Sequence, residues 1–240
     1  MAKICFKSKS IFFHVPKNAG TSLTVFFGRC GWNTFRYSPI DGPSDTISPD
    51  YKYSKGCCIR VRENMKQIAA HNDLEREQGK TIPYFVKNMN SSELQMVKKI
   101  DHNTWGDFYK FAFVRNPWDR LISAWKNRVT SIPTFEKFLD CLPFDKRLTD
   151  IYWHTMPQYD HLYDEQGKRL VQDIFKYEEL DVYMDHIKLK LALPDFSIDK
   201  KWNSSGARKR YSEYYTKTEQ IEKVAKIYEK DINQFNYKYR

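Results

Sequence analysis

Two segments of the chain have the pattern of a strand that leads through a short loop into a helix. In the first, a β-rich run from Ser10 to Val15 stops at Pro16, and the apolar segment from Leu23 to Phe27 predicts a buried helix. In the second, Phe111 to Val114 is apolar without polar alternation, which is typical of a strand covered on both faces in a parallel sheet. Both segments therefore predict α/β architecture.

The second segment carries a strong helix-start signal. Arg115 lies at the end of the predicted strand, Asn116 is a suitable N-cap residue, and Pro117 suits the first helical position. Asp119 in the first turn would be favoured by the helix dipole. We expect this helix to run to about Val129.

The rest of the chain adds further strands and helices and predicts one α/β domain over residues 1–240, with a central, mainly parallel sheet flanked by helices. The stretch 41–55, rich in Pro, Ser, Asp and Tyr, predicts an irregular insertion, and 212–235 predicts an amphipathic closing helix. The other expected elements are strands at Ile82–Val86 and Val171–Tyr177 and a helix from Glu178 to Leu193, which ends before Pro194.

Composition and charge restrict the class of protein. The 240 residues, of which 41% are hydrophobic and 16% aromatic, suffice for a sizeable core, and the formal net charge of +10 favours anionic partners. Five cysteines without a C-x-x-C pair predict neither a disulfide framework nor a zinc site. The early apolar run Ile11–Phe13 is too short for a signal peptide or a membrane span, so we expect a soluble, cytoplasmic protein.

The first loop has the residues of an anion site. It would aim backbone N–H groups and the start of a helix at the anion, with Lys17 as a cation, Gly20 allowing close approach, and hydroxyls from Thr21 and Ser22. Its lysine precedes the glycine, unlike in a Walker A loop, which disfavours a nucleoside triphosphatase. An ordinary turn with a solvated lysine is the alternative.

The second junction could hold another anion. Arg115 and Ser123 are eight residues apart, about two helical turns, so both could reach one phosphate. Alternatively, Arg115 pairs with a surface carboxylate beside a capped helix. Two such junctions would lie at the carboxyl ends of strands, where open α/β sheets bind ligands.

Two segments carry a family resemblance. FFHVPKNAGTSL and FAFVRNPWDRLISAW resemble the two signatures of the sulfotransferase superfamily, in particular the carbohydrate sulfotransferase branch that resembles family 2. The resemblance implies a sulfotransferase fold like that of P-loop kinases and the donor 3'-phosphoadenosine 5'-phosphosulfate, with adenosine 3',5'-bisphosphate as product. It implies that Arg115 and Ser123 bind the 3'-phosphate and that the 5' side is bound by Lys17, Asn18, Ala19, Gly20, Thr21 and Ser22.

The resemblance continues to the C-terminus in HTMPQYDHL, DIFKYEEL and YEKDINQFNYKY, and the basic stretch from Asn203 to Tyr211 resembles a region that can close over the nucleotide. Relatives of this branch often have a histidine between the two signatures. This chain instead reads Lys87 to Ser92 as KNMNSS. The identity of the catalytic base is therefore open.

Sulfuryl transfer needs in-line geometry, charge stabilisation and a base for the attacking hydroxyl, and it needs no metal. Lys17 is the natural partner of the leaving phosphate oxygen. For the base, His154 lies in a loop-like segment that could line an acceptor site, and His71 is the second candidate. A carboxylate such as Glu63 is also possible, and we expect His161 to flank a helix.

The acceptor would be a carbohydrate or another hydroxyl-bearing molecule, possibly acidic, because basic clusters alternate with Tyr and Trp. A small-molecule or lipid-linked acceptor is equally compatible. Two other functions stay open: a nucleotide or small-molecule kinase, which would need ATP and magnesium, and a non-enzymatic nucleic-acid-binding module. We expect no nucleic-acid partner.

Overall fold

The computed structural model describes residues 2–35, 56–78, 95, 98–129, 131–145, 149–198 and 210–240. Three expectations from the sequence lie outside these residues: the strand at 82–86, the irregular insertion at 41–55, and nearly all of the basic stretch from 203 to 211.

The described strands form a sheet in the order β3-β1-β2-β4-β5. Strand β4 pairs with β2 on one side and with β5 on the other, both in parallel, whereas β1 is antiparallel to β2 and to β3. Four of these five strands therefore run in one direction, and only β1 is reversed. Their bounds are β1 Ala2–Cys5, β2 Ser10–Phe13, β3 Asn33–Phe35, β4 Tyr109–Val114 and β5 Asp173–Lys176.

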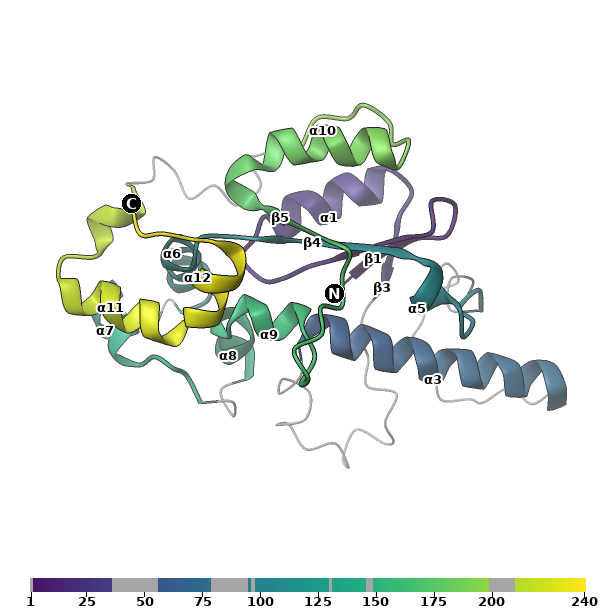
Figure 1. Ribbon diagram of the computed structural model, residues 1–240, viewed down its shortest axis with the longest axis horizontal. Coiled ribbons are helices and arrows are strands. Elements are labelled where there is room, and N and C mark those ends of the chain that lie inside the picture. Colours follow the sequence, from purple (N-terminus) through teal and green to yellow (C-terminus); the bar gives the residue numbers. More distant parts are fainter. Residues whose placement is uncertain are drawn as a thin grey trace.

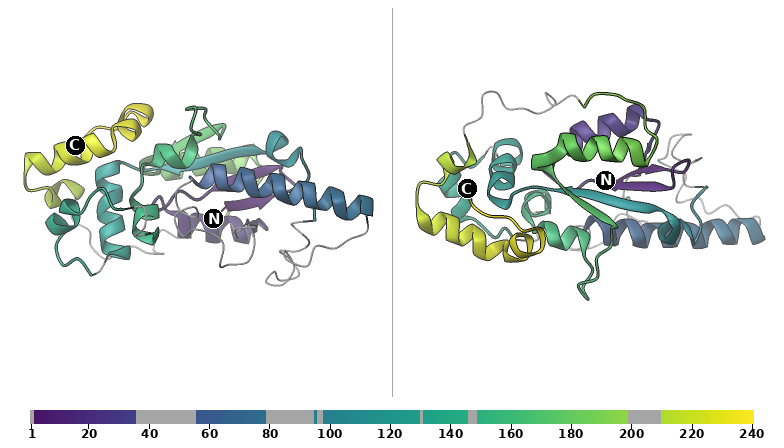
Figure 2. Two further views of the ribbon diagram at one scale, coloured as in Figure 1. Left: turned by 90° about the horizontal axis from the view of Figure 1, so that it is seen from below. Right: turned by 45° about the horizontal axis from the view of Figure 1, so that its top comes forward.

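Helices cover both faces of the sheet (Figure 1). Helices α1 (Gly20–Arg29) and α10 (Leu180–Lys190) lie above it in this view, and α3 (Cys57–Gln78) and α9 (Gln158–Leu162) lie below. The tilted view of Figure 2 shows the same two layers. The short helix α5 (Thr104–Asp107) leads directly into β4.

The central strands bury both of their faces. In β4, Ala112 and Val114 join the apolar cluster on the α3 side, whereas Phe111 and Phe113 join the cluster on the α1 and α10 side. All four side chains are at most 1% exposed. The two faces follow from the two-residue period of a strand, and they confirm the expected strand.

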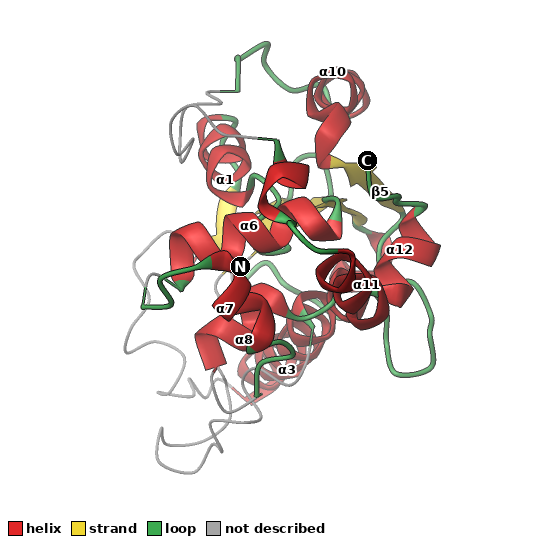
Figure 3. Ribbon diagram, turned by 90° about the vertical axis from the view of Figure 1, so that its left-hand side faces the viewer, coloured by secondary structure: helices red, strands yellow, loops and turns green. Residues whose placement is uncertain are grey.

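A group of helices lies beyond the carboxyl ends of the parallel strands, where Figure 3 looks at it end-on. These helices are α6 (Pro117–Arg128), α7 (Phe135–Asp140), α8 (Thr149–Thr155), α11 (Thr218–Ile227) and α12 (Glu229–Phe235). Short 3-10 turns occur at Tyr177–Glu179 and Tyr211–Tyr214. Buried residues of α6, α7 and α11 share one apolar cluster.

Helix α6 begins as the sequence predicts. Asn116 is the N-cap, its side chain accepts a hydrogen bond from Trp118 N (3.1 Å), and Pro117 occupies the first turn. This arrangement satisfies an N–H group that a helix start would otherwise leave without a partner.

The expectation of one closing helix over 212–235 is wrong. The chain makes a 3-10 turn, then α11, and then α12 after a break at Tyr228, whose φ and ψ are −108° and 27°. Tyr228 is 1% exposed and its hydroxyl donates to the carbonyl of Thr155, so the residue at the break is anchored in the interior. The sequence pattern does not predict strands β1 and β3, because both are short and each is stabilised by pairing with a neighbouring strand.

Candidate active site

The two predicted loops lie side by side because β2 and β4 are adjacent and parallel. Phe13, the last residue of β2, pairs with Ala112 of β4, so the chain leaves the sheet at the same edge after each of these strands. We call these two points the strand exits: the first is the loop after β2, and the second is the segment after β4 that begins at Arg115. Direct contacts join the two exits: Asn18 Nδ2 donates to the carbonyl of Phe113 at 2.8 Å, and Arg115 Nη1 donates to that of Lys17 at 3.1 Å.

The backbone of the first loop has the shape of an anion-binding concavity. Lys17 and Ala19 have φ values of 72° and 57°, in the left-handed region, and Asn18 between them does not. Alternation of this kind turns successive N–H groups toward one point, which favours an anion. Each non-glycine residue in that region costs about 1–2 kcal/mol, so surrounding contacts must hold the loop.

Helix α1 starts immediately after this loop and continues the concavity. Its first internal hydrogen bond runs from Leu23 N to the carbonyl of Ala19 (3.0 Å), and Ala19 has no polar side chain to cap the end. Thr21 is exposed, whereas Ser22 is buried. The positive end of α1 therefore adjoins the loop, with a hydroxyl at its surface.

Gly20 is needed for a reason that the sequence did not reveal. An ideal Cβ at position 20 would lie 1.7 Å from Nε2 of His14, so the imidazole occupies the space that a side chain would fill. The histidine that precedes the loop thus packs directly against its far end. A close approach by backbone was expected at this glycine, but toward a phosphate.

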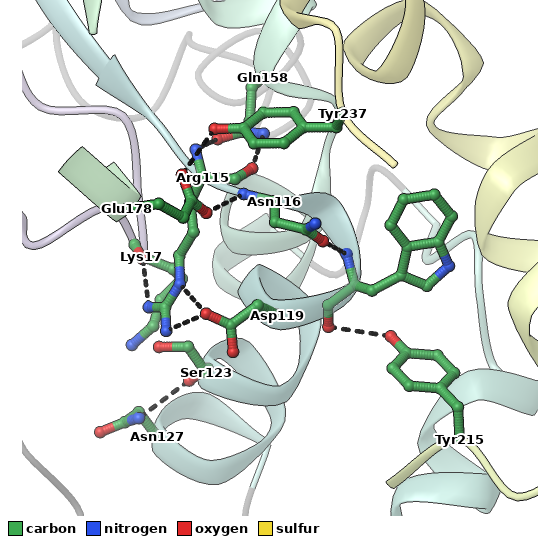
Figure 4. A network of polar contacts seen from close by, with 11 residues as sticks. Lys17, Arg115, Asn116, Asp119, Ser123, Asn127, Gln158, Glu178, Tyr215 and Tyr237 are labelled. Atoms are coloured by element: carbon green, nitrogen blue, oxygen red, sulfur yellow. Dashed lines mark hydrogen bonds and ion pairs between the residues drawn. The ribbon is translucent and has the colours of Figure 1, made fainter. Parts of the chain in front are cut away.

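Arg115 extends from the second exit toward the first loop (Figure 4). Nη2 lies 2.6 Å and Nε 2.7 Å from Oδ2 of Asp119, and the guanidinium lies 4.4 Å from the centroid of the Tyr177 ring. The Arg115 side chain is 7% exposed. A guanidinium has more N–H groups than these contacts and the one to Lys17 use, so it can also bind an anion.

Residues 115, 119 and 123 follow one face across the start of α6, as the spacing predicts, and Figure 4 shows Ser123 just beyond Asp119. Ser123 is partly exposed, and its carbonyl accepts a hydrogen bond from Asn127 Nδ2 at 2.9 Å. Asp119 holds the fork of Arg115 in a fixed orientation. From the sequence, Asp119 is expected only to favour the helix dipole, and its pairing with Arg115 is visible only in the structure.

Residues 2–238 match the family described as "Sulfotransferase family". The chain belongs to this family. The match confirms the resemblance carried by the two signatures and covers both strand exits described above. Comparison with curated proteins found no match, and comparison with solved structures found none either.

Residues after β5 brace the second exit in this family member. Asn116 N donates to Oε1 of Glu178 at 2.7 Å, and the hydroxyl of Tyr237 donates to Oε2 at 3.1 Å. The Asn116 side chain also donates to the carbonyl of Lys238 at 3.1 Å. The C-terminal segment therefore holds the backbone of the second exit in place.

Arg120 supports the first loop from the interior, which no sequence signal indicated. It is 1% exposed, and its Nε and Nη1 each lie 3.0 Å from a carbonyl oxygen, of Pro16 and of Met156 respectively. Burial lowers the pKa of this guanidinium. An arginine embedded among apolar helix residues looks like a surface residue until the fold is known.

The structure corrects two expectations about histidines. His154 lies in the last turn of α8 instead of a loop, with Nδ1 2.7 Å from the carbonyl oxygen of Asp150. His161 lies within α9 and is fully buried, and this burial, with Arg120 nearby, holds its pKa well below the usual value. His71 belongs to α3, but its side chain lies outside the described residues, whereas Glu63 on the same helix is partly exposed.

Two features are absent from the described residues. Side chains of His, Cys, Asp and Glu do not gather there in groups of three or more that could hold a metal ion. Nor does that part of the chain contain a helix with the length and apolar character needed to cross a membrane.

Proposed function

We propose that this chain transfers a sulfuryl group from 3'-phosphoadenosine 5'-phosphosulfate to a hydroxyl of a carbohydrate acceptor. The main support is the contact between the two strand exits, in which Arg115 Nη1 reaches the carbonyl of Lys17 at 3.1 Å. Two anion sites this close suit a nucleotide with phosphates on both its 3' and 5' sides. The family membership and the net charge of +10 agree with an anionic donor.

The first loop would bind the 5' side. The N–H groups from Asn18 to Ser22 and the start of α1 would stabilise negative charge on the transferred group, and the Lys17 ammonium would stabilise charge on the leaving phosphate oxygen. Asn18 would contribute only its backbone N–H, because its side-chain amide donates in the interior to the carbonyl of Phe113 and to Gln158. Ala19 and Gly20 would likewise act through their backbone.

The second exit would bind the 3' side. Arg115 would donate to the 3'-phosphate from a fork oriented by Asp119, and the Ser123 hydroxyl would add a hydrogen bond. This division distinguishes the donor from ATP, which has no 3'-phosphate. The bound donor would supply the sulfuryl group and a good leaving group for direct displacement by the acceptor.

We propose His154 as the base that removes the proton of the acceptor hydroxyl, with His71 as the alternative. Two residues beyond His154, the carbonyl of Met156 accepts a hydrogen bond from Arg120, which also binds the carbonyl of Pro16. This arrangement ties the end of α8 to the start of the first loop.

The donor is tested by calorimetric titration of adenosine 3',5'-bisphosphate into the protein, with ATP and magnesium as comparison. We expect binding of the bisphosphate, and loss of about tenfold or more in affinity for Lys17→Ala and for Arg115→Ala. Tighter binding of ATP with magnesium would favour a kinase. Steeply salt-dependent binding of nucleic acid, unaffected by Lys17→Ala, would favour a nucleic-acid-binding module.

Acceptor and base are tested by transfer of labelled sulfate to a panel of acidic glycans, neutral glycans and small alcohols. With the best acceptor, His154→Asn should lower kcat by about 10²-fold or more while leaving bisphosphate affinity unchanged. The same result for His71→Asn, with His154→Asn active, would move the base to α3.

A further inference from the structure

Gln158, the first residue of α9, connects the two strand exits. Its Oε1 accepts hydrogen bonds from Asn18 Nδ2 and from Arg115 N, each at 2.8 Å. Its Nε2 donates to the carbonyl of Arg115, also at 2.8 Å. One fully buried side chain therefore contacts the first loop through Asn18 and both backbone groups of Arg115.

Asp231 of α12 sets the orientation of this amide. Its Oδ2 accepts from Gln158 N at 2.9 Å and from Gln158 Nε2 at 3.2 Å, and its Oδ1 accepts from Tyr159 N at 2.7 Å. Because a carboxylate only accepts, Nε2 must face Asp231, and Oε1 must face the N–H groups of Asn18 and Arg115. Asp231 is also fully buried.

The contact to Asn18 falls at the centre of the first loop. Lys17 and Ala19, on either side of Asn18, are the two residues with left-handed backbone. Asn18 is held inward by Gln158 and by the carbonyl of Phe113, so its neighbours are held in the conformation that turns N–H groups outward. Gln158 thus acts on loop shape and on the position of Arg115 at once.

An apolar side chain could fill this space at less desolvation cost. The polar network instead joins four separate segments of the chain: the first loop, the second exit, α9 and α12. A fixed separation of two anion sites matters only for a ligand that occupies both, because binding at the second then becomes intramolecular.

We infer that Gln158, oriented by Asp231, is a positioning residue that sets the spacing between the 5' and 3' anion sites. This inference rests on the proposed function. It assigns to Gln158 no contact with the nucleotide. The substitution of Gln158 should therefore affect a ligand with two phosphates much more than a ligand with one.

The experiment compares adenosine 3',5'-bisphosphate with adenosine 5'-monophosphate and adenosine 3'-monophosphate by calorimetry, in the unaltered protein and in Gln158→Met. Methionine has a similar length and no hydrogen-bonding amide. We expect the bisphosphate affinity to fall about tenfold and each monophosphate affinity by less than about threefold. Asp231→Asn should likewise lower the ratio of bisphosphate affinity to monophosphate affinity.

Asn72→Leu is the matched control. Asn72 is also a buried amide that donates to a backbone carbonyl, that of Ile100 at 2.7 Å. It lies 16 residues beyond Gly56, roughly 24 Å along α3, and Gly56 is the residue that packs against Asp160 of α9. This variant should lose stability and keep the ratio of affinities.

The outcomes separate the two claims. If the unaltered protein does not bind the bisphosphate, the proposed function is wrong. If it binds, and folded Gln158→Met keeps the ratio, the inference about spacing is wrong. An equal fall for the bisphosphate and for one monophosphate would also overturn it, since Gln158 would then support a single site. Should Gln158→Met not fold, Asn18→Ala removes the contacts of the first loop to Gln158 and to the carbonyl of Phe113 but leaves the bonds between Gln158 and Arg115, and its ratio of affinities decides by the same criteria.

Discussion

At the scale of residues, the two signatures gain their chemistry from neighbours that short motifs do not contain. Lys17 and Ala19 are held in left-handed conformations, and Arg115 is held by Asp119 and Tyr177. These constraints hold the hydrogen-bond donors of the protein in place before the ligand arrives, which reduces the entropy cost of ordering them on binding. Substitutions that keep charge but change geometry should therefore be damaging.

Arg115→Lys tests geometry against charge. A lysine keeps the positive charge but cannot bind Asp119 with two nitrogens and the carbonyl of Lys17 with a third. We expect bisphosphate affinity to fall about tenfold or more, measured by calorimetry. The control Lys126→Arg, on the same helix, should bind the bisphosphate as tightly as the unaltered protein. Full affinity in Arg115→Lys would mean that charge alone suffices.

Gly20→Ala tests the close approach of His14. The added methyl group would lie 1.7 Å from His14 Nε2, so the imidazole or the loop must move. We expect a lower melting temperature and about tenfold weaker bisphosphate binding. In the double variant Gly20→Ala, His14→Ala, the space is restored and the two effects should be non-additive. Additive losses would show that the clash is not the cause.

At the scale of elements, α9 and α12 serve the site from outside the sheet. The N-terminal residues of α9 donate to Asp231 of α12, and α12 reaches this position because the C-terminal segment bends at Tyr228. An unbroken helix over 212–235 would follow one straight axis. The change of direction at the break therefore lets the Asp231 carboxylate reach Gln158 beside the second strand exit.

Asp231 should give the stability a characteristic pH dependence. Burial raises its pKa to about 6, above the ordinary value of 3.8, although N–H donors of Tyr159 and Gln158 and the nearby Arg120 lower it; Tyr228 and Tyr237 also lie near. The folded state therefore holds the proton more tightly between about pH 4 and 6. Over this window, the contribution of Asp231 to the free energy of unfolding falls as pH rises.

The measurement is urea unfolding at pH 4.5 and 6.5. Relative to Asp231→Asn, which has no titrating carboxylate, the unaltered protein should lose on the order of 2 kcal/mol between these pH values. Asp185→Asn on α10, where the carboxylate is 76% exposed, serves as the control. An equal slope in Asp231→Asn and the unaltered protein would contradict the raised pKa.

At the scale of the whole molecule, the site depends on contacts between distant parts of the chain. Arg115 and Lys17 are 98 residues apart, and Asn116 and Lys238 are 122 apart. The C-terminal residues hold the backbone at the second strand exit. Removing one of their hydrogen-bonding groups should therefore weaken binding of the bisphosphate.

Tyr237→Phe tests this long-range support. It removes the hydrogen bond to Glu178, whose other carboxylate oxygen holds Asn116 N. We expect a loss of about 1 kcal/mol in the free energy of unfolding and a measurable loss of bisphosphate affinity. Tyr239→Phe, which removes a bond to the carbonyl of Ser212, should lower stability without changing affinity. Equal affinity in both variants would contradict the proposed coupling.

The sequence by itself determined the two strand exits and the start of α6. Apolar periodicity, a capping asparagine and a proline act within a few residues, so they can be read along the chain. The same local signals predicted Arg115 and Ser123 on one helix face. They misplaced His154 in a loop, although it lies in α8, and they did not predict that His161 is buried, because burial of a histidine depends on what packs over it.

Only the tertiary structure decided how the exits meet and what holds them. The parallel pairing of β2 with β4 sets the loops side by side, and Gln158, Asp231 and Arg120 join segments that lie far apart in the chain. A buried glutamine, aspartate or arginine resembles a surface residue in a sequence, since polar groups are usually exposed. Their contribution arises only from partners that folding brings within hydrogen-bond distance.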